Sequence, residues 1–265
     1  MTKNRIDTTL AQCKKTGKKA LIPFITSGDG GYDCTEQAVM EMIKNGADLI
    51  ELGVPFSDPI AEGPVIQRAS ERSLRQGTTL SGIFEMVQRL RKKTDTPLLF
   101  MMYLNTIFRF GTDRFFQTCQ ICGIDGVIVP DIPYEEKDEI QGSADKYNVH
   151  NISLVTPASE DRIQMIASDA TGFLYCVSSN GVTGVRQKFD TEFDPLFEKI
   201  YKYAKIPCAV GFGISGPEAA KKMSKYCDGV IVGSAIVKLV EQYGGKTAPK
   251  EIGIFIKSLR QALDN

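Results

Sequence analysis

Short apolar runs alternate with helical patterns along the whole chain. Most of these runs are apolar at every position and rich in β-branched residues, as expected for strands that are buried on both faces of a parallel sheet. The predicted strands are Ala20–Ile25, Leu49–Leu52, Leu98–Tyr103, Gly126–Val129, Ile152–Val155, Phe173–Val177, Cys208–Val210 and Val230–Val232.

Between the runs, apolar residues recur at the spacing of amphipathic helices. Two such sets are Thr35, Ala38, Val39, Met42, Ile43 and Phe193, Leu196, Phe197, Ile200, Ala204. Pro195 and Pro217 fall in first helical turns, and Gly46 and Gly123 follow helix ends. The chain therefore repeats a strand-then-helix unit.

Eight such units without a Ser/Gly/Pro-rich linker predict an α/β fold, a single (β/α)8 TIM barrel spanning residues 1–265. Ile6, Leu10 and Cys13 have helical spacing before the first strand and predict an extra N-terminal helix on the barrel floor. An open doubly wound sheet is the alternative. Its dinucleotide-binding glycine pattern is incomplete here, because Gly28-x-Gly30 is followed by Asp33.

The charge balance and the cysteine content limit the classes of partner and the compartment that the sequence predicts. The 32 Lys and Arg residues balance 32 Asp and Glu residues, so no global field attracts nucleic acid or an anionic membrane. No apolar run approaches the roughly 18 residues of a membrane span, and the polar N-terminus does not resemble an export signal. The seven cysteines are expected to be free thiols in a reducing cytoplasm.

Glu51 is the first candidate for catalysis. It lies near the carboxyl end of the second predicted strand, on the same side as Leu49, so alternation points its side chain into the barrel mouth. A buried carboxylate is either paired structurally or has a raised pKa suited to proton transfer. We favour proton transfer because glutamate is seldom buried for structural reasons.

The loop that follows, Gly53–Pro64, contains three prolines and two further carboxylates. It resembles a shaped lid over the barrel mouth. Flanking apolar residues favour an inward direction for Glu62. Asp58 is equally compatible with a solvated turn in which it binds nearby backbone N–H groups.

Glycine-rich turns follow the seventh and eighth strands. They are Gly211-Phe212-Gly213 and Gly233-Ser234, and the second leads into a helix. Backbone N–H groups and a helix N-terminus at these two loops form the phosphate site of many TIM barrels. The alternative is that these glycines only make tight turns.

The sixth strand ends in the stretch Tyr175–Val185, which continues as a long, polar, glycine-hinged loop of the kind that closes over a ligand. Tyr175 either binds substrate through its hydroxyl or fills the barrel. Cys119 and Cys122 lack the partners that zinc needs, and the single histidine, His150, lies at the structural end of the barrel. We therefore expect no metal site, and the residues favour carboxylate acid–base chemistry.

The stretch Glu51–Gly63, ELGVPFSDPIAEG, closely resembles the signature of the tryptophan synthase α-subunit family. Ile22–Asp29, Gly181–Gly184, Gly211–Ser215 and Gly233–Val237 extend the resemblance over essentially the whole chain. The resemblance implies cofactor-free retro-aldol cleavage of indole-3-glycerol phosphate to indole and glyceraldehyde 3-phosphate.

The resemblance also implies roles for individual residues. Glu51 is the implied general acid/base, Glu62 the partner of the indole N–H, and Tyr175 and Thr183 orient the site and its lid. The other implied substrate-binding residues are Phe24, Tyr103, Gly184, Gly211, Phe212, Gly213, Gly233 and Ser234. Pro55, Asp58 and Pro59 are implied to face a partner.

That partner is a β-subunit, which holds pyridoxal phosphate and receives indole in an α2β2 complex. Two departures from the family pattern stand out: position 62 is more often aspartate, and Ser179-Asn180 lacks an arginine found in some members. The alternatives are a catalytically silent subunit that activates the β-subunit, and another phosphosugar-binding barrel such as an isomerase.

Overall fold

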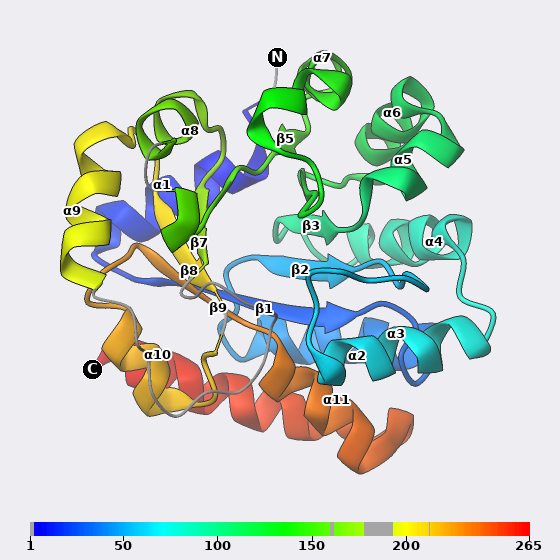
Figure 1. Cartoon of the computed structure of the whole chain (residues 1–265). Coiled ribbons are helices and arrows are strands. Elements are labelled where there is room, and N and C mark those ends of the chain that lie inside the picture. The colour runs from blue at the N-terminus through cyan, green and yellow to red at the C-terminus, as the bar shows by residue number, and fades with distance from the viewer. Residues whose placement is uncertain (1–2, 160–161, 178–192, 212) are drawn as a thin grey trace.

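Parallel strands in the computed structural model form one curled sheet, surrounded by helices (Figure 1). The structure describes residues 3–159, 162–177, 193–211 and 213–265. The strands in these residues are β1 (Ala20–Thr26), β2 (Ile50–Gly53), β3 (Leu98–Met101), β4 (Gly126–Ile128), β5 (His150–Asn151), β6 (Leu154–Val155), β7 (Leu174–Val177), β8 (Cys208–Gly211) and β9 (Gly229–Val232).

Helices separate most of the strands, as the hydrophobic periodicity predicts, with two helices after β2 and two after β3. They are α1 (Arg5–Thr16), α2 (Tyr32–Lys44), α3 (Pro64–Arg75), α4 (Leu80–Arg91), α5 (Leu104–Phe110), α6 (Thr112–Cys122), α7 (Asp138–Lys146), α8 (Ile163–Asp169), α9 (Phe193–Tyr203), α10 (Pro217–Met223) and α11 (Ser234–Asp264). Two short 3-10 helices cover Tyr134–Glu136 and Pro157–Ser159. The described helices include none long and apolar enough to cross a membrane.

The strand order is β5-β4-β3-β2-β1-β9-β8-β7-β6, and its two ends are consecutive in the chain. Only Ile152 and Ser153 separate β5 from β6. The N–H of Ile152 donates to the carbonyl of Val127 in β4 at 2.8 Å, and the carbonyl of Ser153 accepts from the N–H of Tyr175 in β7 at 3.0 Å. The sheet therefore closes into the predicted barrel, with its fifth strand divided into two halves that each pair with one neighbour.

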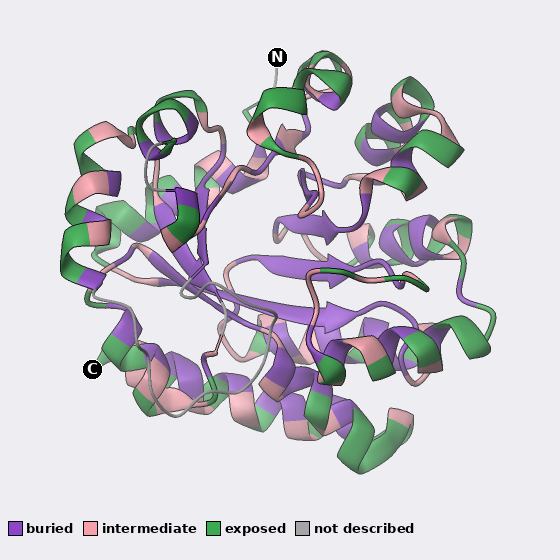
Figure 2. Ribbon diagram, in the orientation of Figure 1, coloured by how far each residue is buried: buried purple, intermediate pink, exposed green. Residues whose placement is uncertain are grey.

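Both faces of the strands are buried, which explains their continuous apolar runs (Figure 2). In β1, Ile22 and Phe24 point into the barrel, whereas Leu21 and Ile25 pack against the surrounding helices. The helices bury one side and expose the other. This alternation fixes which strand residues can reach the barrel interior.

Helix α1 closes the barrel floor, as predicted. Its residues Ile6, Leu10 and Cys13 are buried in the same apolar cluster as the inward-facing strand residues. His150 also lies at this end, where its Nε2 atom is 3.0 Å from Asp7 Oδ1 of α1. The predicted structural position of the histidine is thus confirmed.

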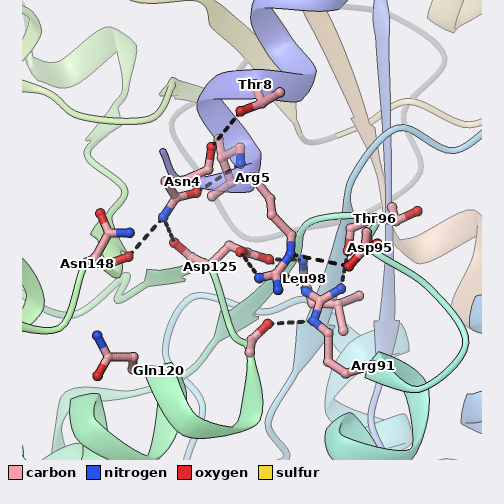
Figure 3. Close-up of polar contacts among 12 residues, drawn as sticks. Asn4, Arg5, Thr8, Arg91, Asp95, Thr96, Leu98, Gln120, Asp125 and Asn148 are labelled. Atoms are coloured by element: carbon pink, nitrogen blue, oxygen red, sulfur yellow. Dashed lines mark hydrogen bonds and ion pairs between the residues drawn. The ribbon is translucent and has the colours of Figure 1, made fainter. Parts of the chain in front are cut away.

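A carboxylate joins the floor to the strands (Figure 3). Asp125 directly precedes β4, and its side chain accepts from Arg5 Nη1 at 2.8 Å and Arg91 Nη2 at 2.7 Å. It also accepts from the N–H of Leu98 at 2.9 Å. Because the Asp125 side chain is only 4% exposed, these donors offset the cost of burying its charge.

Asn4 attaches α1 to the same place. Its side-chain oxygen accepts from the N–H of Ile6 and caps the helix, while its amide nitrogen donates to the carbonyls of Asp125 at 2.9 Å and Asn148 at 3.0 Å. One buried side chain therefore starts the helix and docks it.

We expect Asn4→Ala to lower the free energy of unfolding by about 2 kcal/mol, because it removes a helix cap and two buried hydrogen bonds. The measurement is equilibrium unfolding in urea. Thr79→Ala is the matched control, since Thr79 caps α4 through one bond to the N–H of Gly82. The control should lose only about 1 kcal/mol. Equal losses in the two variants would contradict a docking role for Asn4.

The cysteines agree with the sequence-based expectation. All seven are free and buried. Cys119 and Cys122 lie on α6, and the Cys122 thiol accepts from Gln88 Nε2 at 3.4 Å. The described residues contain no group of three or more His, Cys, Asp or Glu side chains that could hold a metal ion.

Candidate active site

The barrel interior opens into a small cavity at the carboxyl ends of the strands, where TIM barrels carry their catalytic groups. The lining residues are Phe24, Glu51, Glu62, Ile66, Met101, Tyr175, Gly213, Ile214, Ile231, Gly233 and Ser234. The free space measures about 30 Å³, enough for about one or two water molecules. Its wall is mostly apolar, with two carboxylates and one phenol.

Glu51 is placed by β2, where it pairs in register with Phe24 of β1. It is 1% exposed, and its Oε2 atom has no hydrogen-bond partner within the described part of the chain. Burial raises the pKa of Glu51 to about 8. At neutral pH this side chain is therefore predominantly an uncharged acid that can donate a proton into the cavity.

Tyr175 lies near Glu51 on the inner face of β7. Burial raises its pKa well above the ordinary value, and the charge that Glu51 can carry raises it further. The phenol therefore keeps its proton and acts as a hydrogen-bonding group. A side chain at Gly211 would collide with the Tyr175 hydroxyl, so this glycine provides room for the tyrosine.

Glu62 reaches the cavity from the loop between β2 and α3. The pKa of Glu62 is raised by burial, and a hydrogen bond from the Tyr103 hydroxyl opposes this shift. The same hydroxyl oxygen accepts from the N–H groups of Ile60 and Ala61, each at 2.9 Å. Phe56 stacks on the Tyr103 ring with the centroids 4.8 Å apart. Tyr103 thus holds both the loop and the carboxylate that it carries.

Part of the cavity wall is formed by the turns after β8 and β9. Gly213 and Ile214 come from the first turn, and Gly233 and Ser234 come from the second, at the N-terminus of α11. The first N–H groups of a helix have no intrahelical partners and favour a negative charge. This part of the wall suits an anion, whereas the apolar side chains that line the cavity suit an apolar ring.

Most of the candidate residues meet in this one cavity. Those that line it are Phe24, Glu51, Glu62, Tyr175, Gly213, Gly233 and Ser234. Tyr103 contributes through Glu62, and β3 ends before it at Met101. The predicted Thr183, Gly184 and Phe212 lie outside the described residues, as does the pair Ser179-Asn180.

The three residues predicted to face a partner do not line the cavity. Asp58 is exposed, Pro59 is half-buried and Pro55 is buried. Asp58 accepts a hydrogen bond from the Ser57 hydroxyl. This side-chain contact takes the place of the bonds to backbone N–H groups that a solvated turn predicts. Ile60, on the same loop, is 72% exposed.

The sequence reasoning missed the apolar lining formed by Ile66, Met101, Ile214 and Ile231. Strand alternation could have found Met101, which is two residues after the inward-facing Leu99. It could also have placed Ile231 between the outward-facing Val230 and Val232. Ile66 lies in the first turn of α3, where periodicity does not distinguish the cavity from the core.

Comparison with known proteins decides the family. The family model described as tryptophan synthase alpha chain matches residues 10–262. This chain belongs to the tryptophan synthase alpha chain family. The tryptophan synthase alpha chain of Clostridium kluyveri is 45% identical over 262 residues, which cover 98% of this chain and 100% of the relative.

Solved structures of the family have the same fold. Tryptophan synthase subunit alpha from Legionella pneumophila matches with a TM-score of 0.89 and 38% identity, covering 100% of both chains. A chain from the tryptophan synthase a2b2 complex of Pyrococcus furiosus matches with a TM-score of 0.82 and 32% identity, covering 91% of this chain and 98% of that one. The similarity to the family therefore covers the whole barrel, including the residues that line its cavity.

Proposed function

We propose that this chain, as one catalytic domain of residues 1–265, cleaves indole-3-glycerol phosphate to indole and glyceraldehyde 3-phosphate. The observation that carries the proposal is Glu51, a buried and predominantly uncharged acid facing a cavity in a member of the tryptophan synthase alpha chain family. The cavity combines an apolar wall, a second carboxylate and a part of the wall that suits an anion. These are the groups that the reaction needs.

Glu51 supplies the proton transfers. Its carboxyl group donates a proton to the indole carbon that bears the side chain, and the resulting carboxylate then accepts the proton of the adjacent side-chain hydroxyl. As that oxygen becomes a carbonyl, the bond between the ring and the side chain breaks and its electron pair returns to the ring. Glu51 ends the cycle protonated, and the products are indole and an aldehyde.

Glu62 stabilises the ring during this sequence. Protonation of the ring carbon places positive charge on the indole nitrogen, and a carboxylate that accepts its N–H lowers the energy of that state. Phe24 and the apolar wall hold the ring, and Tyr175 orients the reacting groups through its phenol. The α11 N-terminus at Gly233 and Ser234, with Gly213 opposite, holds the phosphate.

Access to the cavity requires movement, because about 30 Å³ does not accommodate a bicyclic ring. The loop that carries Glu62 is the segment of the wall held by the Tyr103 hydroxyl. We propose that substrate enters when this loop moves outward. Thr183 and Gly184 belong to the proposed lid. Gly211 and Phe212 belong to the residues proposed to bind the phosphate.

A second subunit completes the proposed enzyme. Ile60 is exposed on the loop between β2 and α3, and Phe108 is exposed on α5. A groove between these two segments is lined by Pro55, Phe56 and Asn105. We propose that this face, with Asp58 and Pro59, contacts a tryptophan synthase β-subunit in an α2β2 complex. The pyridoxal phosphate of the second reaction then belongs to that partner, and this chain works without a cofactor in the cytoplasm.

The direct test is indole release from indole-3-glycerol phosphate by the purified chain, alone and with a tryptophan synthase β-subunit. We expect slow release alone and faster release with the partner. Stimulation of the β reaction without any indole release would identify a silent regulatory subunit. No effect on either reaction would redirect the search to other phosphosugar substrates.

We expect Tyr103→Phe to lower turnover about tenfold, because Glu62 loses its donor and two loop N–H groups lose their acceptor. Indole release under saturating substrate is the measurement. Tyr147→Phe is the matched control, since its hydroxyl donates to Asp113 on the surface at 2.8 Å. Equal turnover in the two variants would show that the Tyr103 hydroxyl does not position Glu62.

A further inference from the structure

Three segments meet behind the proposed active site: the turn after β1, helix α3 and the first part of α11. Figure 1 shows α3 and α11 side by side. Asp29, in the turn, accepts from Arg72 Nε at 2.9 Å and from Arg72 Nη2 at 2.7 Å. The Asp29 side chain is only 2% exposed. This bidentate pair joins α3 firmly to the end of β1.

Two arginines join α3 to α11. Arg68 donates to both carboxylate oxygens of Glu241, at 2.8 and 3.3 Å. Arg72 donates to Glu241 through Nη1 at 3.3 Å while it holds Asp29 through its other nitrogens. Arg72 therefore bridges two carboxylates that come from two different segments.

The backbones of two of these segments also touch. A Cβ atom on Gly245 of α11 would lie 2.6 Å from the carbonyl oxygen of Gly30. The helix is kinked at this point, with Gly244 at φ +69°. Only glycine permits this contact, which sets the distance between the turn after β1 and α11.

The joined helices begin at the proposed active site. Helix α3 starts at Pro64, two residues after Glu62, and Ile66 in its first turn lines the cavity. Helix α11 starts at Ser234, in the part of the wall that suits an anion. Because helices are stiff, fixing α3 against α11 fixes the Glu62 part of the cavity wall relative to the part that suits an anion.

We propose that Arg68 and Arg72 are positioning residues for the cleavage reaction: through Asp29 and Glu241 they hold the helix behind Glu62 against the helix that binds phosphate. The inference rests on the proposed function. Arg68 is about half exposed, as is typical of pairs that contribute little to stability, so a role in geometry accounts for the Arg68–Glu241 pair better than a role in stability.

The test uses Glu241→Gln and Arg72→Lys, which weaken the contacts to both segments while keeping side chains of similar size. Arg75→Gln is the matched control. Arg75 lies on the same helix but pairs only with the exposed Glu71, at 3.5 Å in the described structure. For each chain, kcat and KM for indole release are measured with the β-subunit present, below the onset of thermal unfolding, together with the Kd for glycerol 3-phosphate.

We expect kcat to fall about tenfold in both test variants, with KM and the Kd for glycerol 3-phosphate changed less than about twofold. The control should match the parent chain. Unchanged kcat in Glu241→Gln, or in Arg72→Lys where that variant folds, overturns the positioning role even if the melting temperature falls. If the parent chain itself releases no indole, the proposed function fails first and the positioning role fails with it.

Discussion

Glu51→Gln is expected to release indole at least about 100-fold more slowly than the parent chain. The amide keeps the shape of the side chain but has no acidic proton to transfer to the ring and is too weak a base to accept one from the hydroxyl. The groups proposed to bind phosphate lie on the turns after β8 and β9, so the Kd for glycerol 3-phosphate should stay nearly unchanged. Single-turnover indole release and ligand titration measure the two effects separately.

The same variant has an opposite effect on stability. The pKa of Glu51 is about 8 in the folded chain and near 4.5 in the unfolded chain, so only the unfolded chain loses its proton between these values. The free energy of unfolding therefore declines as pH rises from about 4.5 to about 8, and stays lowered above that. Glutamine does not titrate and removes this penalty.

We therefore expect Glu51→Gln to be more stable than the parent at pH 9 by several kcal/mol, with about 5 kcal/mol as the upper limit. At pH 5 the difference should be small. Urea unfolding at both pH values tests this, with Glu71→Gln as a control because Glu71 is exposed. A stability gain that is the same at both pH values would mean that Glu51 is ionised in the folded chain, and near-normal turnover would remove it from the mechanism.

Glu62→Ala should also lower turnover, by about 100-fold. Loss of the carboxylate leaves the protonated ring without a negative partner in an apolar cavity, where charge stabilisation is strongest. Rates of indole release at saturating substrate provide the measurement. Glu71→Ala, on the outer face of the following helix, controls for loss of a carboxylate in this region.

The position of the charge can be tested as well. Glu62→Asp introduces the residue that the family resemblance favours at this position and moves the carboxylate by about one bond length, a change to which catalytic rates respond. If Glu62→Ala released indole as fast as the parent, the ring nitrogen would have to be held by another group. If only Glu62→Asp were as active as the parent, the carboxylate itself and not its reach would be the requirement.

Regular secondary structure made part of the site predictable. Glu51 lies two residues after the inward-facing Leu49, and side chains alternate along a strand, so the sequence predicts that Glu51 points into the barrel. The pairing of Glu51 in register with the inward-facing Phe24 confirms that direction. Likewise, the spacing of Ile6, Leu10 and Cys13 predicted the floor helix. In strands and helices the backbone period determines where a side chain points, so the sequence contains that information.

Other contacts depend on the packing of distant segments. Tyr103 and Glu62 are 41 residues apart, and Asp29 and Arg72 are 43 apart, so no local period predicts either contact. One contact of Gly211 was also missed. A side chain at this position would collide with the Tyr175 hydroxyl on the neighbouring strand, so the glycine makes room for that hydroxyl, while its place beside a phosphate stays a prediction.

The divided fifth strand gives the barrel a seam. β5 and β6 are two residues long each, whereas β1 and β9 pair over four residues elsewhere in the sheet. Local opening begins where strands have the fewest ladder partners, so the wall should open along β5 and β6, which each pair with one neighbour, before it opens along β1, which pairs on both sides. The barrel wall then hinges at the divided strand. Its backbone amides should be least protected from exchange with solvent in β5 and β6, and most protected along β1 and β9.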